Sequence, residues 1–481
     1  MIYAVSPSTP ILMDFARLGA AVSGRVLGPP RGGFGSVHVD SRKIKPGSLF
    51  VALEGSVQDG HRYVEAAFQA GASGALVERS RLEDPALGLG ETAKRYGRTL
   101  VVAEDTLRAL QDAAMVYLQG FPGLLRIGLS GSSGKTTTKS IAAAIIGGER
   151  ETVMNPMNWN SETGLPLAVF EVRAHHRVGI FELGMNRKNE IAELARVLKP
   201  RIALITNVGL SHIGRIGSAE GIAMEKKRIF LYQREDDIAL IPEDCPFRDL
   251  LAEGLRGTRR FYGPESVGGL GPVRDLGLLG SEIVWAGKTV RFRLPGRHNL
   301  ADAVAAIAIA RELGIGDKAI REGLESAEPL DGRSEVITGT MTVIRDLYNA
   351  NPESVAAAIG FCDELDYPGR KVYVLGSMLE LGDASAEAHR ELARTLSRSA
   401  ADMVFLYGGE MEAAAAALAE NRGAGEGTPR FFHTNSMDEL GSALRGYVAP
   451  GDLVLVKGSR GCELERLDPV LLDGGEERKC S

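Results

Sequence analysis

A glycine-rich loop, SGSSGKTTT at residues 130–138, is the stretch of the sequence best suited to chemistry. It carries the Gly-Lys-Thr triplet of phosphate-binding loops, but Leu129 stands where the G-x-x-x-x-G-K-[ST] pattern has its first glycine. An apolar run, LLRIGLSG, enters the loop, and a helical stretch, TTTKSIAAAIIG, leaves it. Backbone N–H groups and the start of a helix can surround phosphate oxygens in this context. Ordinary helix capping by glycine and serine is the alternative.

The loop therefore predicts a nucleotide site. We expect Lys135 to contact the β- and γ-phosphates, and Thr136 or a neighbour to lie near Mg²⁺. The expected nucleotide contacts in this loop are Gly131, Ser132, Ser133, Gly134, Lys135, Thr136 and Thr137.

Two further candidates follow apolar runs that are typical of strands. VGIFELG carries Glu182 at its end, and IALITNVGLSH places His212 five residues after Asn207. Ligands of open α/β sheets bind at the carboxyl ends of the strands, and Mg²⁺ prefers oxygen ligands. We expect Glu182 to bind Mg²⁺ and His212 to contact metal or phosphate. The alternatives are that Glu182 caps the next helix and that His212 is an ordinary surface or core histidine.

Lys226 lies on the apolar face of a predicted helix. In SAEGIAMEKKRIFLY, with Ser218 as the N-cap, helical spacing places Lys226 on the same face as Ile222, Ile229 and Phe230. A buried ammonium is costly unless it is paired or modified. The alternative is a lysine that extends along the helix edge to reach water.

Strands and helices alternate along the chain, which predicts an α/β fold with parallel sheets. We expect three domains, at residues 1–103, 104–327 and 328–481. The central one would have a P-loop-type, mostly parallel sheet with helices on both faces, and the last would be Rossmann-like. PILMDFARLGAAVSG predicts an amphipathic helix that ends near Gly24, and the glycine-rich stretch 263–280 predicts a loop.

Composition excludes several classes of protein. A net charge of −6 and a pI near 5.9 do not suit a protein that binds nucleic acid through a basic surface. The cysteines, Cys245, Cys362, Cys462 and Cys480, fit neither a disulfide framework nor a metal motif. The chain has no run of ~18 apolar residues and no basic region typical of a signal peptide. We expect a cytoplasmic protein without a membrane span or a nucleic-acid partner.

Motifs along nearly the whole chain resemble those of the Mur ligase family. The shortened loop is similar to the G-[TS]-x-G-K-T-[TS] loop of Mur ligases and folylpolyglutamate synthetase. The further segments that carry the likeness are VDSRKIKPGSLFVALEG, MNWNSETGLPLAVF, ELGMN, NVGLSHIGRIGSAEGIAMEKKRIF, LPGRHNLADAVAA, DGRSE, IRDLYNANPESVAAAI, VLGSMLELGDASAEAH and VLVKGSRGCELE.

The resemblance implies roles for individual residues. Further nucleotide contacts would be Asn299, Asp302, Arg333, Asp346, Tyr348 and Asn351, with Arg333 reaching the γ-phosphate. The implied metal ligands are Thr136, Glu182, His212 and Lys226, and the implied catalytic residues are Lys135, His212, Lys226 and Arg333. Lys226 matches a lysine that carries a carbamate, and burial favours the neutral amine to which CO₂ adds.

Four residues are implied contacts of the second substrate. Asn158 and Asn160 match a substrate-binding stretch of the family. Ser41 and Arg42 match positions near a uridine nucleotide. A tight loop stabilised by an Asp40–Arg42 contact is the alternative for this last pair.

Several positions depart from the family pattern. Ser161 replaces an asparagine, Ser377 replaces an aspartate, and Arg345 and Leu347 lie within an otherwise similar motif. Asp302 replaces an asparagine that faces adenine, and a carboxylate accepts hydrogen bonds where an amide also donates. This substitution puts the adenine contact in doubt.

The implied activity is ADP-forming peptide-bond synthesis through an acyl phosphate. The substrates would be ATP, UDP-MurNAc-tripeptide and D-alanyl-D-alanine, with two Mg²⁺ ions and carbamylated Lys226 in a monomeric enzyme. The presence of YNANP and the absence of D-N-P-R favour the dipeptide over a diamino acid. The alternatives are a related Mur or folylpolyglutamate-type ligase with another amine, and an inactive nucleotide-binding relative.

Overall fold

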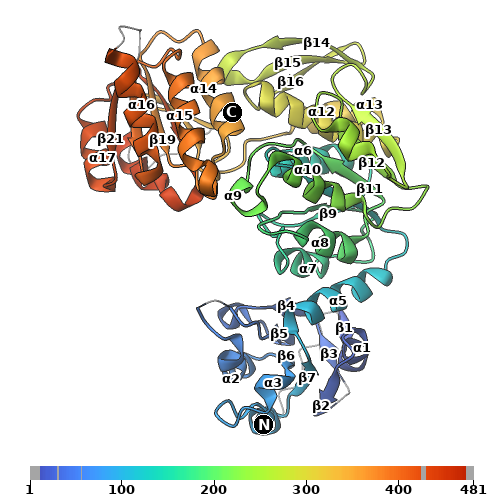
Figure 1. The fold of residues 1–481 in the computed structure, drawn as a ribbon. Coiled ribbons are helices and arrows are strands. Elements are labelled where there is room, and N and C mark those ends of the chain that lie inside the picture. Colours follow the sequence, from blue (N-terminus) through green and yellow to red (C-terminus); the bar gives the residue numbers. More distant parts are fainter. Residues whose placement is uncertain (1–10, 30–31, 56, 424–428, 473–481) are drawn as a thin grey trace.

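The computed structural model describes residues 11–29, 32–55, 57–423 and 429–472. Three lobes follow one another along the chain, each built on one large sheet with helices packed against it (Figure 1). The predicted α/β class is confirmed. None of the helices in the described ranges is both long enough and apolar enough to span a membrane.

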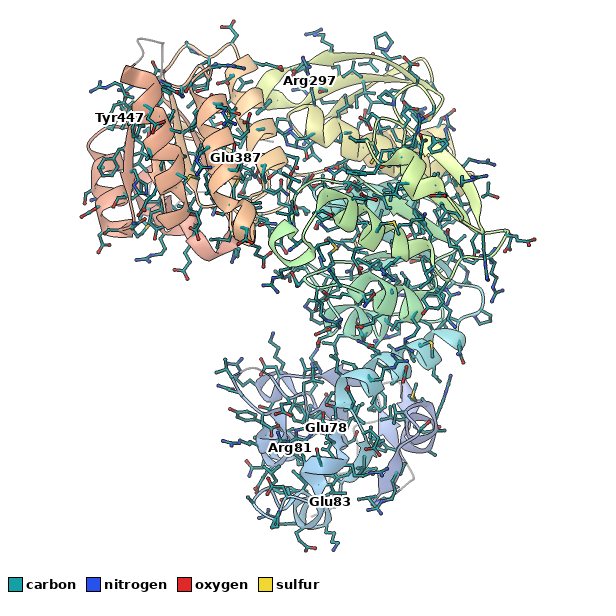
Figure 2. The ribbon with its side chains drawn as sticks, in the orientation of Figure 1. Glu78, Arg81, Glu83, Arg297, Glu387 and Tyr447 are labelled. Atoms are coloured by element: carbon teal, nitrogen blue, oxygen red, sulfur yellow. The ribbon has the colours of Figure 1, made fainter. Side chains whose placement is uncertain are left out.

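The first lobe has a five-stranded sheet of order β2-β7-β6-β5-β4, parallel except for β2. Its strands are β2 (Arg25–Leu27), β4 (Ser36–His38), β5 (Ser48–Val51), β6 (Gly74–Glu78) and β7 (Thr99–Ala103), with β1 (Met13–Asp14) and β3 (Gly33–Phe34) paired separately. Its helices are α1 (Phe15–Ala21), α2 (Val64–Gln69), α3 (Arg79–Leu82) and α4 (Leu89–Tyr96). Its surface carries ion pairs such as that of Arg81 with Glu54. Arg81 is labelled beside Glu78 in Figure 2.

The N-terminal helix is shorter than predicted. Asp14 caps it by accepting a hydrogen bond from Arg17 N at 2.7 Å, so the helix begins at Phe15. It ends at Ala21, because Ser23 turns into the left-handed region with φ of 50°. The first predicted residue, Pro10, lies outside the described residues.

The central lobe contains a fully parallel six-stranded sheet of order β13-β12-β11-β8-β10-β9. The strands are β8 (Leu125–Ser130), β9 (Thr152–Met154), β10 (Val178–Glu182), β11 (Ile202–Ile205), β12 (Ile238–Pro242) and β13 (Thr258–Tyr262). Successive residues face opposite sides: Ile180 joins one hydrophobic cluster and Phe181 the other. The predicted parallel sheet with helices on both faces is confirmed.

Two groups of helices cover this sheet. One face carries α6 (Lys135–Gly147), α12 (Arg297–Glu312) and α13 (Asp317–Glu325). The other carries α5 (Thr106–Gln119), α7 (Gly164–Val169), α8 (Glu190–Leu198), α10 (Ala219–Lys227) and α11 (Arg248–Ala252).

The prediction of a loop at 263–280 is confirmed for residues 263–269, which form turns, but is wrong for the strand that follows. Leu270–Asp275 forms β14, which pairs antiparallel with β15 (Ser281–Trp285), and β15 pairs with β16 (Lys288–Phe292). The register shifts between Leu270 and Val273, so the strand has an irregularity where Gly271 and Pro272 interrupt the apolar pattern. Pairing with β15 therefore stabilises a strand that the glycine-rich local sequence does not predict.

The third lobe has a six-stranded sheet of order β17-β18-β22-β19-β20-β21, in which only β17 is antiparallel. Its strands are β17 (Glu335–Thr338), β18 (Thr342–Asp346), β19 (Lys371–Gly376), β20 (Met403–Tyr407), β21 (Arg430–Thr434) and β22 (Leu453–Lys457). Its helices are α14 (Pro352–Glu364), α15 (Ser385–Leu396), α16 (Glu412–Gly423), α17 (Met437–Arg445) and α18 (Asp468–Leu471).

The second and third lobes are in contact. Arg297, labelled where they meet in Figure 2, lies 3.4 Å from Glu364 of α14 through Nη2 and Oε2. Leu210 N donates to Glu353 Oε1 at 2.8 Å on the same helix. These contacts bring the loops after β8, β10 and β11 close to those after β18 and β22.

Candidate active site

The loop after β8 is a tight cradle at the start of α6. Asn207 Oδ1 accepts hydrogen bonds from the amides of Ser132, at 2.9 Å, and Ser133, at 3.0 Å. Gly134 is in the left-handed region with φ of 75°, and a Cβ there would lie 2.0 Å from Asp302 Oδ1. Only glycine fits this position.

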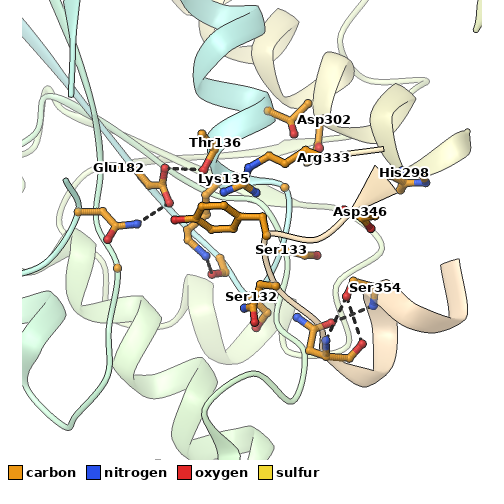
Figure 3. Close-up of a pocket in the computed structure, with 18 of the residues that line it drawn as sticks. Ser132, Ser133, Lys135, Thr136, Glu182, His298, Asp302, Arg333, Asp346 and Ser354 are labelled. Atoms are coloured by element: carbon orange, nitrogen blue, oxygen red, sulfur yellow. Dashed lines mark hydrogen bonds between the residues drawn. The ribbon is translucent and has the colours of Figure 1, made fainter. Parts of the chain in front are cut away.

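A cavity of about 230 Å³ opens over this loop between the second and third lobes (Figure 3). It brings together most of the residues that the sequence nominated for nucleotide or metal. These are Gly131, Ser132, Ser133, Gly134, Lys135, Thr136, Thr137, Asn160, Glu182, His212, Lys226, Asn299, Asp302, Arg333, Asp346, Tyr348 and Asn351.

Glu182 is the buried anion of the cavity, at the end of β10. Its Oε2 accepts from Thr136 Oγ1 at 2.8 Å, and its Oε1 accepts from Asn160 Nδ2 at 2.7 Å. Burial would raise the pKa of this carboxyl, but Lys135, Lys139, the hydrogen bond from Asn160 and Arg333 together outweigh burial and lower the pKa. Glu182 is therefore a carboxylate at neutral pH.

Lys135 points back onto its own loop, where its Nζ donates to Gly131 O at 2.7 Å. Burial lowers its pKa, and Glu182 opposes that effect. The ammonium lies at the N-terminus of α6, where a phosphate oxygen could replace the carbonyl as its acceptor.

Lys226 is almost completely buried, with 1% of its surface exposed. The predicted N-cap is confirmed, since Ser218 accepts from Gly221 N at 3.0 Å, and Ile222, Ile229 and Phe230 are buried as the spacing indicated. Burial lowers the pKa of the Lys226 ammonium well below its usual value, and Lys135 lowers it further. Lys226 forms no salt bridge with any residue of the described ranges.

His212 precedes α9 (Ile213–Ile216) and adopts a left-handed φ of 63°. Its Nδ1 lies 2.8 Å from Glu380 Oε2 of the third lobe. The same contact, together with Arg215, lowers the pKa of Glu380.

The third lobe supplies the opposite wall. Lys457, with 1% exposed, donates to Asp346 and, at 3.2 Å, to Asn349 O. The Arg333 guanidinium lies 3.7 Å from the centre of the Tyr348 ring. In Figure 3 the labelled Arg333 is close to Lys135 and Thr136.

Asn351 links the two lobes. It caps α14 by accepting from Ser354 N at 2.8 Å, and its Nδ2 donates to Ser211 Oγ at 2.6 Å. Ser211 Oγ in turn donates to Ser132 O at 3.2 Å. The third lobe is thereby connected to the phosphate loop by two hydrogen bonds.

Asp302 and Asn299 lie on the first turns of α12. Burial raises the pKa of Asp302 well above its usual value, although Thr138, Arg333 and Lys135 oppose this. Thr138 Oγ1 lies 3.3 Å from Asp302 Oδ1. A protonated carboxyl can donate a hydrogen bond as an amide does, so a neutral Asp302 could replace the donor that the family's asparagine provides.

Three nominated residues lie outside this cavity. Asn158 lines an adjoining cavity of about 640 Å³ between the same two lobes. Ser41 and Arg42 are in a 3₁₀ turn of the first lobe. There Arg42 is 87% exposed and donates to Asp40 at 2.9 Å, which is the contact named as the alternative.

The remaining departures from the family pattern have local structural roles. Arg345 lies 2.8 Å from both Glu335 and Asp468. Ser161 Oγ accepts from Gly164 N at 3.1 Å before α7. Ser377 is buried at the end of β19, where its amide pairs with Tyr407 O at 2.9 Å.

The structure adds residues that sequence reasoning did not nominate. Lys139 and Asn155 are buried beside Glu182, and Ser211 bridges the lobes. Lys139 follows Lys135 by one helical turn, which was a usable signal, since i and i+4 share a helix face.

The oxygen ligands suit Mg²⁺. Thr136 Oγ1 and Glu182 Oε2 supply a hydroxyl and an ionised carboxylate, the hard ligands that Mg²⁺ prefers, with room for phosphate and water. Among the described residues there is no cluster of three or more His, Cys, Asp or Glu side chains that could hold a metal. Two protein ligands plus substrate phosphate is the usual arrangement for Mg²⁺ at a nucleotide.

The family models match three parts of the chain. Models described as Mur ligase family, catalytic domain; Mur ligase middle domain; and Mur ligase, glutamate ligase domain match residues 34–107, 129–310 and 332–460, respectively.

Whole-length relatives and solved structures agree with these matches. A UDP-N-acetylmuramoyl-tripeptide–D-alanyl-D-alanine ligase of Treponema pallidum is 41% identical over 464 residues, covering 96% of this chain and 99% of the relative. A crystal structure of MurF from Acinetobacter baumannii has a TM-score of 0.84 at 27% identity, covering 95% of this chain and 98% of that one. MurF of Thermotoga maritima in complex with ADP has a TM-score of 0.75 at 26% identity, covering 90% and 96%. The chain belongs to the Mur ligase family.

Proposed function

We propose that the chain joins D-alanyl-D-alanine to UDP-MurNAc-tripeptide, with ATP converted to ADP and phosphate, in the synthesis of peptidoglycan precursors. The observation that carries this conclusion is the convergence of a phosphate loop, Glu182, Lys226 and Arg333 on one cavity. The chain's near-complete match to a relative named for this reaction identifies the amine and the acid. A diamino-acid-adding or folylpolyglutamate-type ligase and an inactive relative are the alternatives.

The first step forms an acyl phosphate. The terminal carboxylate of the tripeptide attacks the γ-phosphorus of ATP, a new O–P bond forms, and ADP leaves. Lys135 and Arg333 are the cations placed to compensate the charge on the transferring oxygens. Residues of the cradle, 131–137, would hold the phosphates through backbone N–H groups.

Mg²⁺ would be held by Thr136 and Glu182. When bound, the ion would neutralise phosphate charge and orient the γ-phosphoryl group. Asn160 keeps the second oxygen of Glu182 occupied, so the carboxylate presents Oε2 to the cavity. His212 lies at the same edge as a further metal or phosphate contact.

Lys226 would carry a carbamate. A neutral amine adds CO₂, and the low pKa that burial gives Lys226 supplies that amine. The product is a carboxylate, which would offer a second Mg²⁺ its protein oxygen. We expect wild-type turnover to fall in CO₂-depleted buffer and to recover with bicarbonate, while Lys226→Met stays slow in both.

The nucleoside would lie between the second and third lobes. Asp346 would contact the ribose, Asn299 and Asp302 would lie toward adenine, and Tyr348 and Asn351 would shape the wall. The uridine end of the other substrate would extend to Ser41 and Arg42, with Asn158 and Asn160 along the path.

In the second step the amine of D-alanyl-D-alanine attacks the acyl carbon and phosphate leaves. An acyl phosphate hydrolyses in water, so the lobes must enclose it during turnover. We propose domain limits of 1–103, 104–327 and 328–481, supported by the end of β7 at Ala103 and by the stretch between α13 and β17. The monomeric state is part of the same proposal.

The test is ATP-dependent phosphate release with Mg²⁺ and UDP-MurNAc-tripeptide. D-alanyl-D-alanine, a diamino acid and glutamate are added in parallel, with Lys135→Ala as the control. Release only with D-alanyl-D-alanine, abolished in the control, supports the proposal. Release with another amine identifies a neighbouring ligase, and nucleotide binding without turnover identifies an inactive relative.

A further inference from the structure

Lys139 lies in the active site, but none of the steps above uses it. It is one helical turn beyond Lys135 on α6, and only 2% of it is exposed. Its Nζ donates to Asn155 O at 2.8 Å and to Met157 O at 3.2 Å, and lies 3.6 Å from Glu182 Oε2. The Lys139 ammonium is therefore almost completely shielded from bulk water and has two carbonyls and one carboxylate as neighbours.

The two carbonyls belong to the segment 155–160, which wraps around Glu182. Asn155 is fully buried; its Oδ1 accepts from Glu182 N at 2.9 Å and its Nδ2 donates to Trp159 O at 2.8 Å. At the other end of the segment, Asn160 Nδ2 donates to Glu182 Oε1. Lys139 therefore contacts both the carboxylate and the segment that encloses it.

Met157 provides an independent sign that this segment is held in place. It has a φ of 43°, in the left-handed region that a side chain with a Cβ rarely adopts. Its side chain is 79% exposed, so packing does not hold this conformation. The hydrogen bonds at this turn are those from Lys139 to the Met157 carbonyl and from Trp159 N to Pro156 O, and strained backbone of this kind is concentrated at functional sites.

We propose that Lys139 is a positioning residue for the acid substrate. It holds the segment 155–160 against Glu182, so that Asn158 and Asn160 line the path of the tripeptide. The adjoining cavity of about 640 Å³ is lined by Lys139, Asn155, Met157 and Asn158, which places this segment on the wall where the tripeptide would enter. This role rests on the proposed function.

The chain offers a matched control in Lys371. This lysine is also buried, at 9% exposed, and also donates to two backbone carbonyls, Asp363 O at 3.0 Å and Leu365 O at 2.8 Å. It lies in the third lobe and lines neither cavity. Lys371→Met therefore reproduces the loss of a buried ammonium without touching the segment.

The kinetic test compares Lys139→Met with Lys371→Met. We expect Lys139→Met to raise the KM for UDP-MurNAc-tripeptide by about tenfold or more, since a hydrogen bond to a charged group is worth at least one tenfold factor. The KM for ATP should change by less than about threefold. Lys371→Met should change neither. Equal KM values in the two variants would overturn the proposal.

Hydrogen exchange of the segment gives a readout that does not need turnover. Peptides covering residues 155–160 should exchange faster in Lys139→Met than in wild type, with Lys371→Met unchanged there. Unchanged exchange in Lys139→Met would overturn the proposal even if no amine substrate supports phosphate release. If Lys139→Met does not fold, Lys139→Gln, which keeps an N–H donor without the charge, replaces it with the same expected direction.

Discussion

In both the second and the third lobe, a lysine and a carboxylate lie at the ends of neighbouring parallel strands, but the two pairs make different contacts. At the end of β22 and β18, Lys457 is paired directly with Asp346 and also donates to Asn349 O. At the end of β8 and β10, Glu182 is buried and Lys135 is half-buried. Lys135 donates to a loop carbonyl, and Glu182 accepts from Thr136 and Asn160, with Lys139 Nζ 3.6 Å away.

The difference separates an ion pair that maintains structure from an arrangement that is open to a ligand. Breaking a buried pair leaves an uncompensated charge and costs stability. The sheet edge of the second lobe instead has several cations around one anion at the N-terminus of α6, which suits a polyanion such as ATP. The comparison predicts that mutations at the second-lobe edge reduce activity most and that mutations at the third-lobe edge reduce stability most.

The largest effect on turnover is expected from Glu182→Gln. The change keeps the shape and removes the charge that would hold Mg²⁺, so phosphate release should fall by about 10³-fold. The change also leaves buried Lys139 without its neighbouring carboxylate, so the melting temperature should fall, but by less than in Lys457→Met. Steady-state phosphate release and thermal unfolding check this. A Glu182→Gln variant with a lower melting temperature but wild-type turnover would contradict the comparison.

Lys457→Met should show the opposite pattern. It leaves Asp346 and the Asn349 carbonyl without their donor, so the third lobe should lose about 3 kcal/mol of unfolding free energy. The KM for ATP should rise by about tenfold, since Asp346 would lose its orientation toward the ribose. Denaturant unfolding measures the first effect; a variant with wild-type stability and abolished turnover would contradict it.

The pH dependence of ATP binding tests the charge at the phosphate loop, where Asp302 lies beside Gly134. Burial raises the pKa of Asp302, so the carboxyl is neutral below that raised value and becomes an anion as pH rises through it. The new charge repels the nucleotide, and ATP affinity should fall with rising pH. Titrations of wild type and Asp302→Asn check this: the fall specific to Asp302 should be absent in the variant, and identical profiles would contradict it.

The smallest effect is expected in the first lobe. Arg42 is exposed, and among the described residues its ion-pair partner is Asp40. Arg42→Ala should therefore leave stability unchanged and raise the KM for the UDP substrate by about threefold. The KM for ATP should not change. A matched Arg62→Ala variant, in the same lobe, controls for general loss of positive charge.

The sequence predicted the residues at the carboxyl ends of β8, β10 and β11 because the motifs that carry them are short and local. The glycine loop, the apolar runs that end near Glu182 and His212, and the helical face of Lys226 are all contained in short windows, and the strand-end rule brings them together. The cavity over the loop contains these residues, as expected.

Other features depend on contacts between distant residues. Lys139 is buried because the segment 155–160 folds over α6, which the helix sequence does not indicate. The strand β14 depends on pairing with β15 across an irregular register. The hydrogen bonds from Asn351 through Ser211 to Ser132 require the packing of two lobes.

The measurement that tests the central claim most directly uses UDP-MurNAc-tripeptide with ¹⁸O in its terminal carboxylate. If the carboxylate attacks ATP at this edge of the sheet, one ¹⁸O atom should appear in the released phosphate when D-alanyl-D-alanine is present, and Glu182→Gln should abolish the transfer. Phosphate that carries no ¹⁸O, released at the wild-type rate, would contradict an acyl phosphate and with it the proposed role of this site.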